Sequence, residues 1–150
     1  MLFQLKLNIT QDIDMYSVAS ANQDEVIQWE LEGTGPGPQL DDLRFELERS
    51  KKSKWNKAAL TSLAELFKEE HWSTPGNWNL PLRTDLYYRD LVEERYGRLR
   101  SIWSQGKRKT KDDGTVETVE EVEERLQAMV TENWHNARAN GRRLHVSLNY

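Results

Sequence analysis

The stretch TDLYYRDLVEERYGRLRSIWSQGKRKTK, residues Thr84–Lys111, decides the fold, because it holds the longest helical pattern in the sequence. Its apolar side chains recur at steps of three and four residues, which places them on one face of a helix. These side chains are Tyr88, Leu91, Val92, Tyr96, Leu99, Ile102 and Trp103. Thr84 is suited to cap this helix and Gly106 to end it. The pattern predicts a helix over 84–105 that needs partners to cover its apolar face.

Positive charge gathers on one flank of this helix and in the residues that follow it. The cations are Arg89, Arg100, Lys107, Arg108, Lys109 and Lys111. Together they could form a strip that contacts phosphates. A solvated charged face beside the acidic Glu93 is the alternative. We therefore treat these six cations as the candidate nucleic-acid-binding residues.

Arg95 differs from the other cations because it falls inside the apolar stripe, between Val92 and Leu99. A guanidinium group in such a place needs a carboxylate or several carbonyl oxygens. We expect Arg95 to reach the edge of the stripe or to pair with an acid on another helix. A functional anion site is the alternative.

Two further segments carry helical patterns. The segment 56–72 has the stripe Leu60, Leu63, Ala64, Phe67 and His71, with Asn56 as a candidate cap. The segment 118–140 begins with a capping box formed by Thr118 and Glu121 and ends at Asn140-Gly141. Residues 40–50 fit either a helix or a strand, and their helix-forming composition favours a short helix.

The two ends of the chain alternate apolar and polar side chains, the pattern of a half-buried strand. Phe3, Leu5, Leu7 and Ile9 do so near the N-terminus, and Ile27, Trp29 and Leu31 repeat the pattern. The breaker-rich loop 33–38 then separates this element from the helices. Residues 144–150 also alternate, which favours a third strand; continuation of the preceding helix is the alternative.

These patterns predict a mainly α fold. We expect an irregular bundle of three principal helices with a small N-terminal β element, and an α+β arrangement is the alternative. The expected domains are an N-terminal β element with its Gly/Pro loop over 1–38 and a helical domain over 39–150. The expected core comprises Leu60, Leu63, Phe67, Val92, Tyr96, Leu99, Trp103, Val122, Leu126 and Val130.

Composition excludes several classes of function. The chain has no cysteine, so disulfides, thiol catalysis and thiolate metal sites are excluded. It has no apolar run near the length of a membrane span and no block typical of a signal peptide. We therefore expect a soluble, intracellular protein of the nucleus or cytoplasm that has no membrane partner.

Charge is segregated along the chain, although the formal net charge is only −4. Residues 1–50 carry three Lys/Arg against ten Asp/Glu, whereas residues 51–111 carry fourteen against seven. Residues 112–132 are acidic again, with one Lys/Arg against eight Asp/Glu. A basic centre between acidic flanks permits either a polyanion-binding face or internal neutralisation.

No convergent catalytic set is visible in the sequence. The three histidines, His71, His135 and His145, lie in different elements without the spacing of metal ligands. No serine lies in a nucleophile elbow. We expect no catalytic residue, no metal site, no cofactor and no small-molecule substrate, and hence no enzyme.

Two resemblances add to these patterns. Trp55, Trp78 and the helix ERYGRLRSIWSQGKRK resemble the tryptophan-bearing helices of Myb/SANT-like DNA-binding domains. That resemblance implies that the helix carrying Arg95, Arg98 and Arg100 would enter the major groove. Residues 38–140 are also similar in style to uncharacterised orphan proteins of mushroom-forming fungi, for which an association with mobile elements is one suggestion. This likeness implies no known activity.

The function predicted from these observations is a non-enzymatic binding module. The first hypothesis is contact with the nucleic-acid phosphate backbone through the basic flank of the central helix. The alternative is a protein-interaction or structural module with no nucleic-acid role. A continuous exposed basic face would favour the first, and coverage of the cations by the acidic helix from Thr118 would favour the second.

Overall fold

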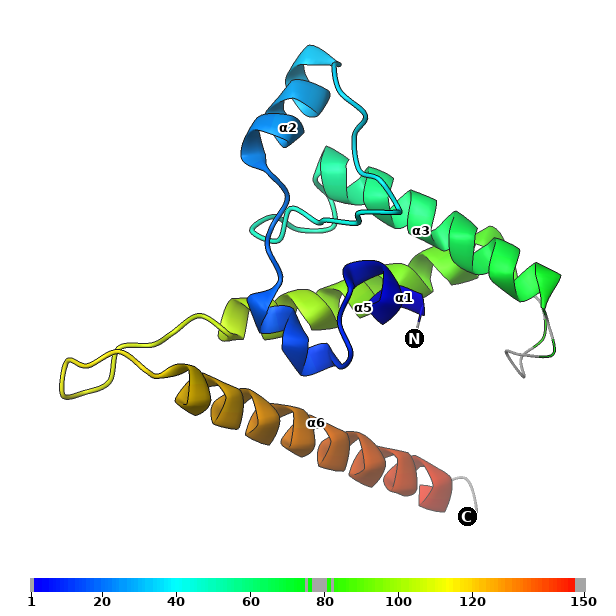
Figure 1. The fold of residues 1–150 in the computed structure, drawn as a ribbon. Helices are drawn as coiled ribbons and strands as arrows, with labels where there is room; N and C mark the ends of the chain where they lie inside the picture. Colours follow the sequence, from blue (N-terminus) through cyan, green and yellow to red (C-terminus); the bar gives the residue numbers. More distant parts are fainter. Residues whose placement is uncertain (1, 75, 77–80, 82, 148–150) are drawn as a thin grey trace. The chain divides into compact units, whose positions relative to one another are not determined.

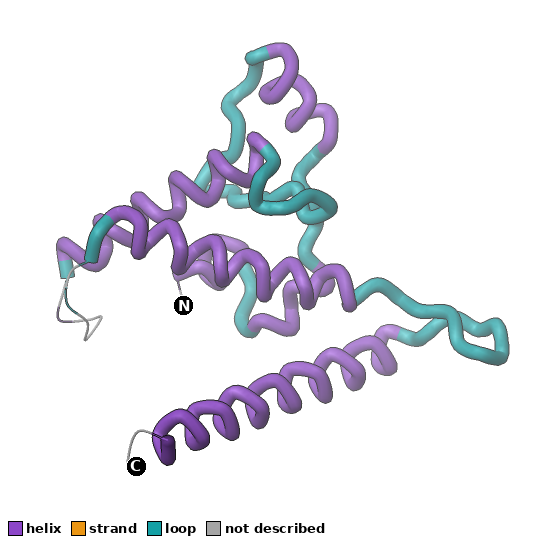
Figure 2. The backbone as a smooth tube through the Cα atoms, turned by 180° about the vertical axis from the view of Figure 1, so that it is seen from behind, coloured by secondary structure: helices purple, strands orange, loops and turns teal. Residues whose placement is uncertain are grey.

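The protein is mainly helical, as predicted, in a computed structural model that describes residues 2–74, 76, 81 and 83–147. Within these residues the helical elements are α1 (Leu2–Leu7), η1 (Asp12–Ser17), α2 (Gln23–Ile27), η2 (Gln28–Glu32), α3 (Lys54–Ser73), α5 (Asp85–Gln105) and α6 (Val119–Ser147). Figures 1 and 2 show these helices and, over the same residues, no strand. The chain divides into two compact units, Met1–Ser104 and Gln105–Tyr150, which are described separately below.

The three principal helices confirm the predicted ones, with corrections at their ends. Ser53, not Asn56, caps α3, because its side chain accepts a hydrogen bond from the Asn56 backbone amide. The predicted capping box of α6 is confirmed, since Thr118 and Glu121 exchange hydrogen bonds of 3.2 Å.

The predicted end of α6 at Asn140-Gly141 is wrong, because the helix continues to Ser147. A glycine inside a helix costs only about 1 kcal/mol, and each further residue adds a backbone hydrogen bond. Residues 144–147 therefore continue the helix, which was the alternative to a strand, and residues 148–150 lie outside the described residues.

The prediction of an N-terminal β element is also wrong, because the described residues of this segment form no strand. Residues 2–7 form α1, in which Phe3 and Leu7 are buried while Leu5 is 72% exposed. Phe3 and Leu7 are four residues apart, so the same pair satisfies both an alternating pattern and a helical one. The second predicted strand lies in the helical stretch of α2 and η2, which ends at Gly33 with a left-handed φ of 69°.

The short helix expected over 40–50 is absent: this segment is an irregular loop with turns. Leu43, Phe45 and Leu47 are all buried, so the alternating side chains are the ones that enter the core. The carbonyl oxygen of Phe45 accepts a hydrogen bond of 2.8 Å from the amide of Ala21. The loop therefore connects the N-terminal segments with α3 and α5.

The core of the first unit lies between α3 and α5. The predicted core residues Leu60, Leu63, Phe67, Val92, Tyr96 and Leu99 are all buried. The rings of Phe45 and Tyr96 lie 4.7 Å apart, and the ring of Phe3 lies 5.9 Å from that of Phe45. Trp103 is only partly buried, and its indole nitrogen donates a hydrogen bond of 3.2 Å to the Val18 carbonyl oxygen.

The second unit consists of a turn-containing loop followed by α6. An antiparallel bridge joins Thr110 to Val116, and Gly114 adopts a left-handed φ of 86° in the turn between them. Of the predicted core residues, Val122 and Leu126 are buried and Val130 is partly buried. In the described part of the chain, no helix combines the length and the apolarity that crossing a membrane requires.

Candidate functional site

Two of the six predicted binding residues, Arg89 and Arg100, belong to α5 in the first unit. The ε nitrogen of Arg89 lies 3.3 Å from a carboxylate oxygen of Glu93. Arg100 donates hydrogen bonds to the carbonyl oxygens of Leu47 at 2.9 Å and Glu48 at 3.2 Å. The guanidinium group of Arg100 therefore holds the 40–50 loop in place.

The other four predicted residues, Lys107, Arg108, Lys109 and Lys111, lie in the loop of the second unit. Lys111 forms an ion pair of 2.5 Å with Glu121, at the start of α6. The ε nitrogen of Arg108 donates to the carbonyl oxygen of Glu117 at 2.6 Å, and the amide of Lys109 donates to the Glu117 carboxylate at 2.8 Å. Acidic residues at and before the start of α6 thus bind the basic loop of their own unit.

Arg95 has the structural role expected of it. Its guanidinium group pairs with Asp12 of η1 at 2.5 Å, and both side chains are about three-quarters buried. The same Asp12 oxygen accepts a hydrogen bond of 2.7 Å from Gln4 in α1. This contact joins the N-terminal helices to α5 and leaves Arg95 engaged in the fold.

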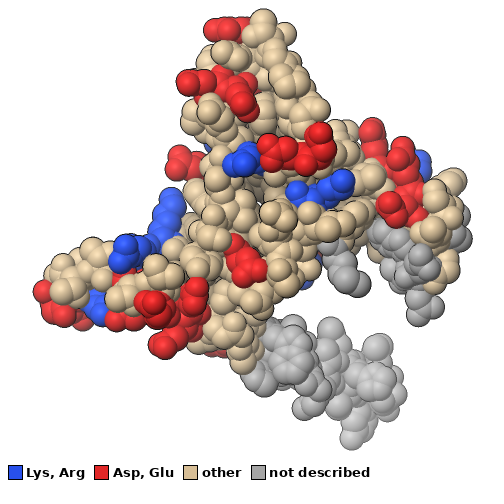
Figure 3. All heavy atoms as spheres, viewed as in Figure 1, with Lys and Arg blue, Asp and Glu red and all other residues tan. Residues whose placement is uncertain are grey.

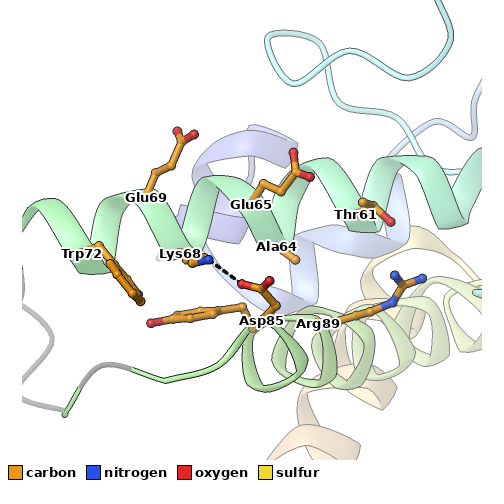
Figure 4. A pocket seen from close by; sticks show the side chains of 9 residues that line it. Thr61, Ala64, Glu65, Lys68, Glu69, Trp72, Asp85 and Arg89 are labelled. Atoms are coloured by element: carbon orange, nitrogen blue, oxygen red, sulfur yellow. Dashed lines mark hydrogen bonds and ion pairs between the residues drawn. The ribbon is translucent and has the colours of Figure 1, made fainter.

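One concave feature of the first unit is a groove of about 540 Å³ between α3 and α5. Its lining residues are Thr61, Ala64, Glu65, Lys68, Glu69, Trp72, Asp85, Tyr88 and Arg89. Figure 4 shows that α3 supplies one wall and α5 the other. This volume falls within the range of ligand-binding pockets. Of the predicted binding residues, only Arg89 lines this groove.

One end of the groove is aromatic and carries an ion pair. Lys68 reaches from α3 to Asp85 of α5 at 2.5 Å, as the dashed line in Figure 4 marks. The Lys68 amine also lies 5.1 Å from the centre of the Trp72 ring, a cation–π distance. The hydrogen bond to Asp85 raises the pKa of Lys68 above its ordinary value of 10.5. Trp72 is 52% exposed, which is high for a tryptophan.

Tyr88 gives this end of the groove a fixed wall. Its hydroxyl lies 2.7 Å from the δ1 nitrogen of His71, and both side chains are buried. The Tyr88 ring also meets that of Tyr87 edge-on at 5.4 Å. The buried hydrogen bond and the ring contact restrict the Tyr88 side chain to one orientation.

Acidic side chains border the α3 side of the groove. Glu65 and Glu69 are exposed and lie one helical turn apart. Neither forms a salt bridge with a residue in the described part of the chain. Both cations of the groove, by contrast, are paired: Lys68 with Asp85, and Arg89 with Glu93. The α3 rim of the groove therefore carries negative charge that no salt bridge with a described residue neutralises, whereas both lining cations are paired.

Glu93 illustrates how the first unit neutralises its own cations. Burial acts to raise the pKa of Glu93, but hydrogen bonds from Lys51 and Arg89 outweigh that effect and lower it. The Lys51 amine lies 3.2 Å from one Glu93 oxygen, and Arg89 lies 3.3 Å from the other. On the face drawn in Figure 3, Lys and Arg side chains are interspersed with Asp and Glu.

Sequence reasoning missed the groove, although α3 carries a signal for it. Glu65, Lys68, Glu69 and Trp72 follow one another at steps of three, one and three residues, and so form a second stripe beside the apolar one. The prediction of this helix used only its apolar stripe, which faces the core. Which neighbour lies beside the second stripe is decided by tertiary packing.

Among residues 2–74, 76, 81 and 83–147, no group of three or more His, Asp or Glu side chains is placed to hold a metal ion. Comparison with known proteins adds no assignment: no protein-family model matches the chain, and neither a curated protein nor a solved structure shows significant similarity to it.

Proposed function

We propose that this chain is a non-enzymatic protein-interaction module whose binding surface is the groove between α3 and α5. The half-exposed Trp72 at the end of this groove carries the proposal. Tryptophan is among the residues that contribute most to binding energy at protein interfaces. An exposed indole beside the fixed Tyr88 ring offers apolar area that a partner side chain would bury.

The exposed Leu86 supports the same proposal. It is 66% exposed and follows Asp85, a lining residue of the groove, in the first turn of α5. Apolar residues that border a polar groove are typical of sites where another protein binds. Trp72 and Leu86 belong to the two helices that form the groove, although Leu86 itself is not one of the lining residues.

The charges around the groove favour a protein partner over a nucleic acid. Glu65 and Glu69 would repel a phosphate backbone brought to the groove. Elsewhere Arg100 donates to backbone carbonyl oxygens, and Lys111 is neutralised by Glu121. Phosphate contact would have to compete with these bonds. The six predicted cations remain a separate hypothesis, and its test is given in the Discussion.

Selection from a random peptide library on the immobilised full chain tests the proposal. We expect enriched peptides that bind the Trp72→Ala variant about tenfold more weakly, as expected for loss of an aromatic anchor. Because Trp72 is half exposed, its truncation leaves the core intact.

Leu31→Ala is the matched control, since Leu31 is 78% exposed but lies on η2 and does not line the groove. Its affinity for the selected peptides should equal that of the unmodified chain. A selection that enriches no peptide, or peptides that bind Trp72→Ala as tightly as the unmodified chain, would overturn the proposed function.

A further inference from the structure

Two acids of the groove, Glu65 and Glu69, form no salt bridge with a described residue and lie one helical turn apart on α3. Glu65 and Glu69 occupy positions i and i+4 of α3, so their Cβ atoms are about 6 Å apart. Like charges at this spacing repel each other and weaken a helix slightly. A ligand that placed positive charge between or beside them would remove this repulsion as well as form new ion pairs.

The two cations that line the groove form ion pairs with other acids. Lys68 lies between Glu65 and Glu69 in sequence, yet its amine reaches across the groove to Asp85 and over the Trp72 ring. Arg89 pairs with Glu93 along its own helix. Figure 4 shows the Glu65 and Glu69 carboxylates at the outer rim of the groove, directed away from α5, while Lys68 is directed towards Asp85.

The acids and Trp72 follow one another along the groove. From Thr61 to Trp72, the lining residues of α3 span eleven steps, about 16 Å of helix. Glu65 and Glu69 lie in the middle of this length and Trp72 lies at its end. A complementary ligand would carry two positive charges about one helical turn apart, followed by an apolar group or a guanidinium group that stacks on the indole ring.

From this arrangement we infer that the α3–α5 groove selects a basic peptide segment of another protein. Two Lys or Arg side chains of that segment pair with Glu65 and Glu69, and a third side chain lies against Trp72. Spacings of i, i+4 in a helical segment or i, i+2 in an extended one both provide the required separation. This inference rests on the proposed function, because it specifies the partner of the same groove.

The test reverses the charge of both acids and compares the peptides that are selected before and after this change. The double variant Glu65→Lys/Glu69→Lys changes two exposed helix positions that make no salt bridge with a described residue, so it should fold like the unmodified chain. The same random peptide library is selected on both proteins. We expect Lys- and Arg-rich peptides on the unmodified chain and Asp- and Glu-rich peptides on the reversed variant.

The matched control reverses two acids outside the groove. Glu32→Lys/Glu48→Lys also changes two exposed acids, on η2 and in the 40–50 loop. This control variant should enrich the same basic peptides as the unmodified chain. Circular dichroism and the thermal unfolding midpoint of all three proteins establish that each is folded.

The affinities of selected peptides provide a second test of the inference. A labelled basic peptide taken from it should bind the unmodified chain about tenfold more tightly than the same peptide with Gln at its cationic positions. Its affinity should fall with added salt, since exposed charges are screened. A peptide in which Glu replaces the cations should bind only the reversed variant.

The outcomes separate the inference from the function on which it rests. If neutral or acidic peptides dominate on the unmodified chain and lose affinity in Trp72→Ala, the groove binds proteins and the inference about charge is overturned. Enrichment of the same peptides on the unmodified and reversed proteins overturns it too. If no peptide is enriched on any of the proteins, both the proposed function and the inference are overturned.

Discussion

The side-chain amide of Asn56 in α3 donates a hydrogen bond of 3.0 Å to the hydroxyl of Tyr96 in α5, and both residues are buried. The same nitrogen also lies 2.9 Å from the carbonyl oxygen of Glu46 and 3.0 Å from that of Ser50, so its two hydrogens are shared among these acceptors. The side-chain oxygen of Asn56 accepts from the amide of Glu46 at 2.7 Å. One side chain therefore joins both principal helices of the first unit to a loop that has no regular hydrogen bonding of its own.

Replacement of Asn56 by alanine should lower the free energy of unfolding by about 2–4 kcal/mol, because several buried polar groups lose their partner at once. Asn56→Asp should be at least as damaging, since a carboxylate would face carbonyl oxygens. Urea unfolding measures both changes. Thr61→Ala, at a partly exposed position of the same helix, is the control, and a loss for Asn56→Ala no larger than the control's would refute this account.

Tyr96 should make the first unit sensitive to alkaline pH. Burial raises the pKa of Tyr96 to about 12, while Arg100 acts to lower it and Glu46 to raise it. A tyrosine in an unfolded chain ionises at about pH 10. Between these two values the unfolded chain binds fewer protons than the folded one, so the free energy of unfolding falls as pH rises through this window.

This dependence is measured by urea unfolding of the unmodified chain and of Tyr96→Phe across that pH window. The variant lacks the ionisable hydroxyl, so its stability should fall less steeply with pH, although it should be less stable at neutral pH. Parallel slopes for the two proteins would show that Tyr96 does not cause the alkaline loss.

The pairing of Arg95 with Asp12 should stabilise the attachment of the N-terminal helices. Asp12→Asn should cost about 1–2 kcal/mol, because it leaves a largely buried guanidinium group without its counter-charge. Arg95→Met should cost less, since it removes the charge and keeps much of the packing. Equilibrium unfolding of the single and double variants gives their coupling energy; single-variant losses that simply add would mean that the pair contributes no interaction of its own.

Glu117 should hold the loop of the second unit against α6. Its carboxylate makes two hydrogen bonds with Arg125, at 3.0 and 3.1 Å, and Arg125 also donates to the carbonyl oxygen of Gln105 at 2.6 Å. Glu117→Gln should lower amide-exchange protection across residues 107–118 by about tenfold, because local opening becomes easier. Glu120→Gln, at an exposed position, is the control and should leave protection unchanged.

The same contact has a defined pH dependence. Hydrogen bonds from Arg125 and from the amide of Lys109 lower the pKa of Glu117 below its ordinary value of 4.5. The stabilisation is therefore fully present above that value and is lost as pH falls through the lowered pKa. Protection factors for 107–118 should decline over this acidic range in the unmodified chain. They should decline less in Glu117→Gln, which has already lost the contact.

Labelled double- and single-stranded DNA and RNA, titrated across a salt series, test the six predicted cations. The ion pairs and carbonyl contacts described above lead us to expect weak binding with a shallow salt dependence, since few phosphates would be neutralised. Lys107→Glu/Lys109→Glu changes two exposed loop positions without disturbing the contact of Arg100 with its loop. Steep salt dependence that this variant abolishes would instead support the nucleic-acid hypothesis.

The sequence by itself determined the three principal helices. The apolar stripe from Tyr88 to Trp103 and the capping box at Thr118 and Glu121 are local signals, since each joins residues three or four apart. The place of Arg95 in the stripe also led us to expect that it would reach the edge of the stripe or pair with an acid on another helix. Its partner Asp12 lies 83 residues away, and no local pattern identifies it.

Tertiary structure decided the features whose partners are distant in sequence. The spacing of Phe3 and Leu7 fits a strand and a helix equally well. In the structure they lie on a helix, and the ring of Phe3 contacts those of Phe45 and Phe67. The 40–50 loop is held by Asn56 and Arg100 instead of by its own helix propensity. The groove exists because α5 lies beside the second stripe of α3, and such long-range packing arises from burial and side-chain hydrogen bonds that a local sequence pattern does not encode.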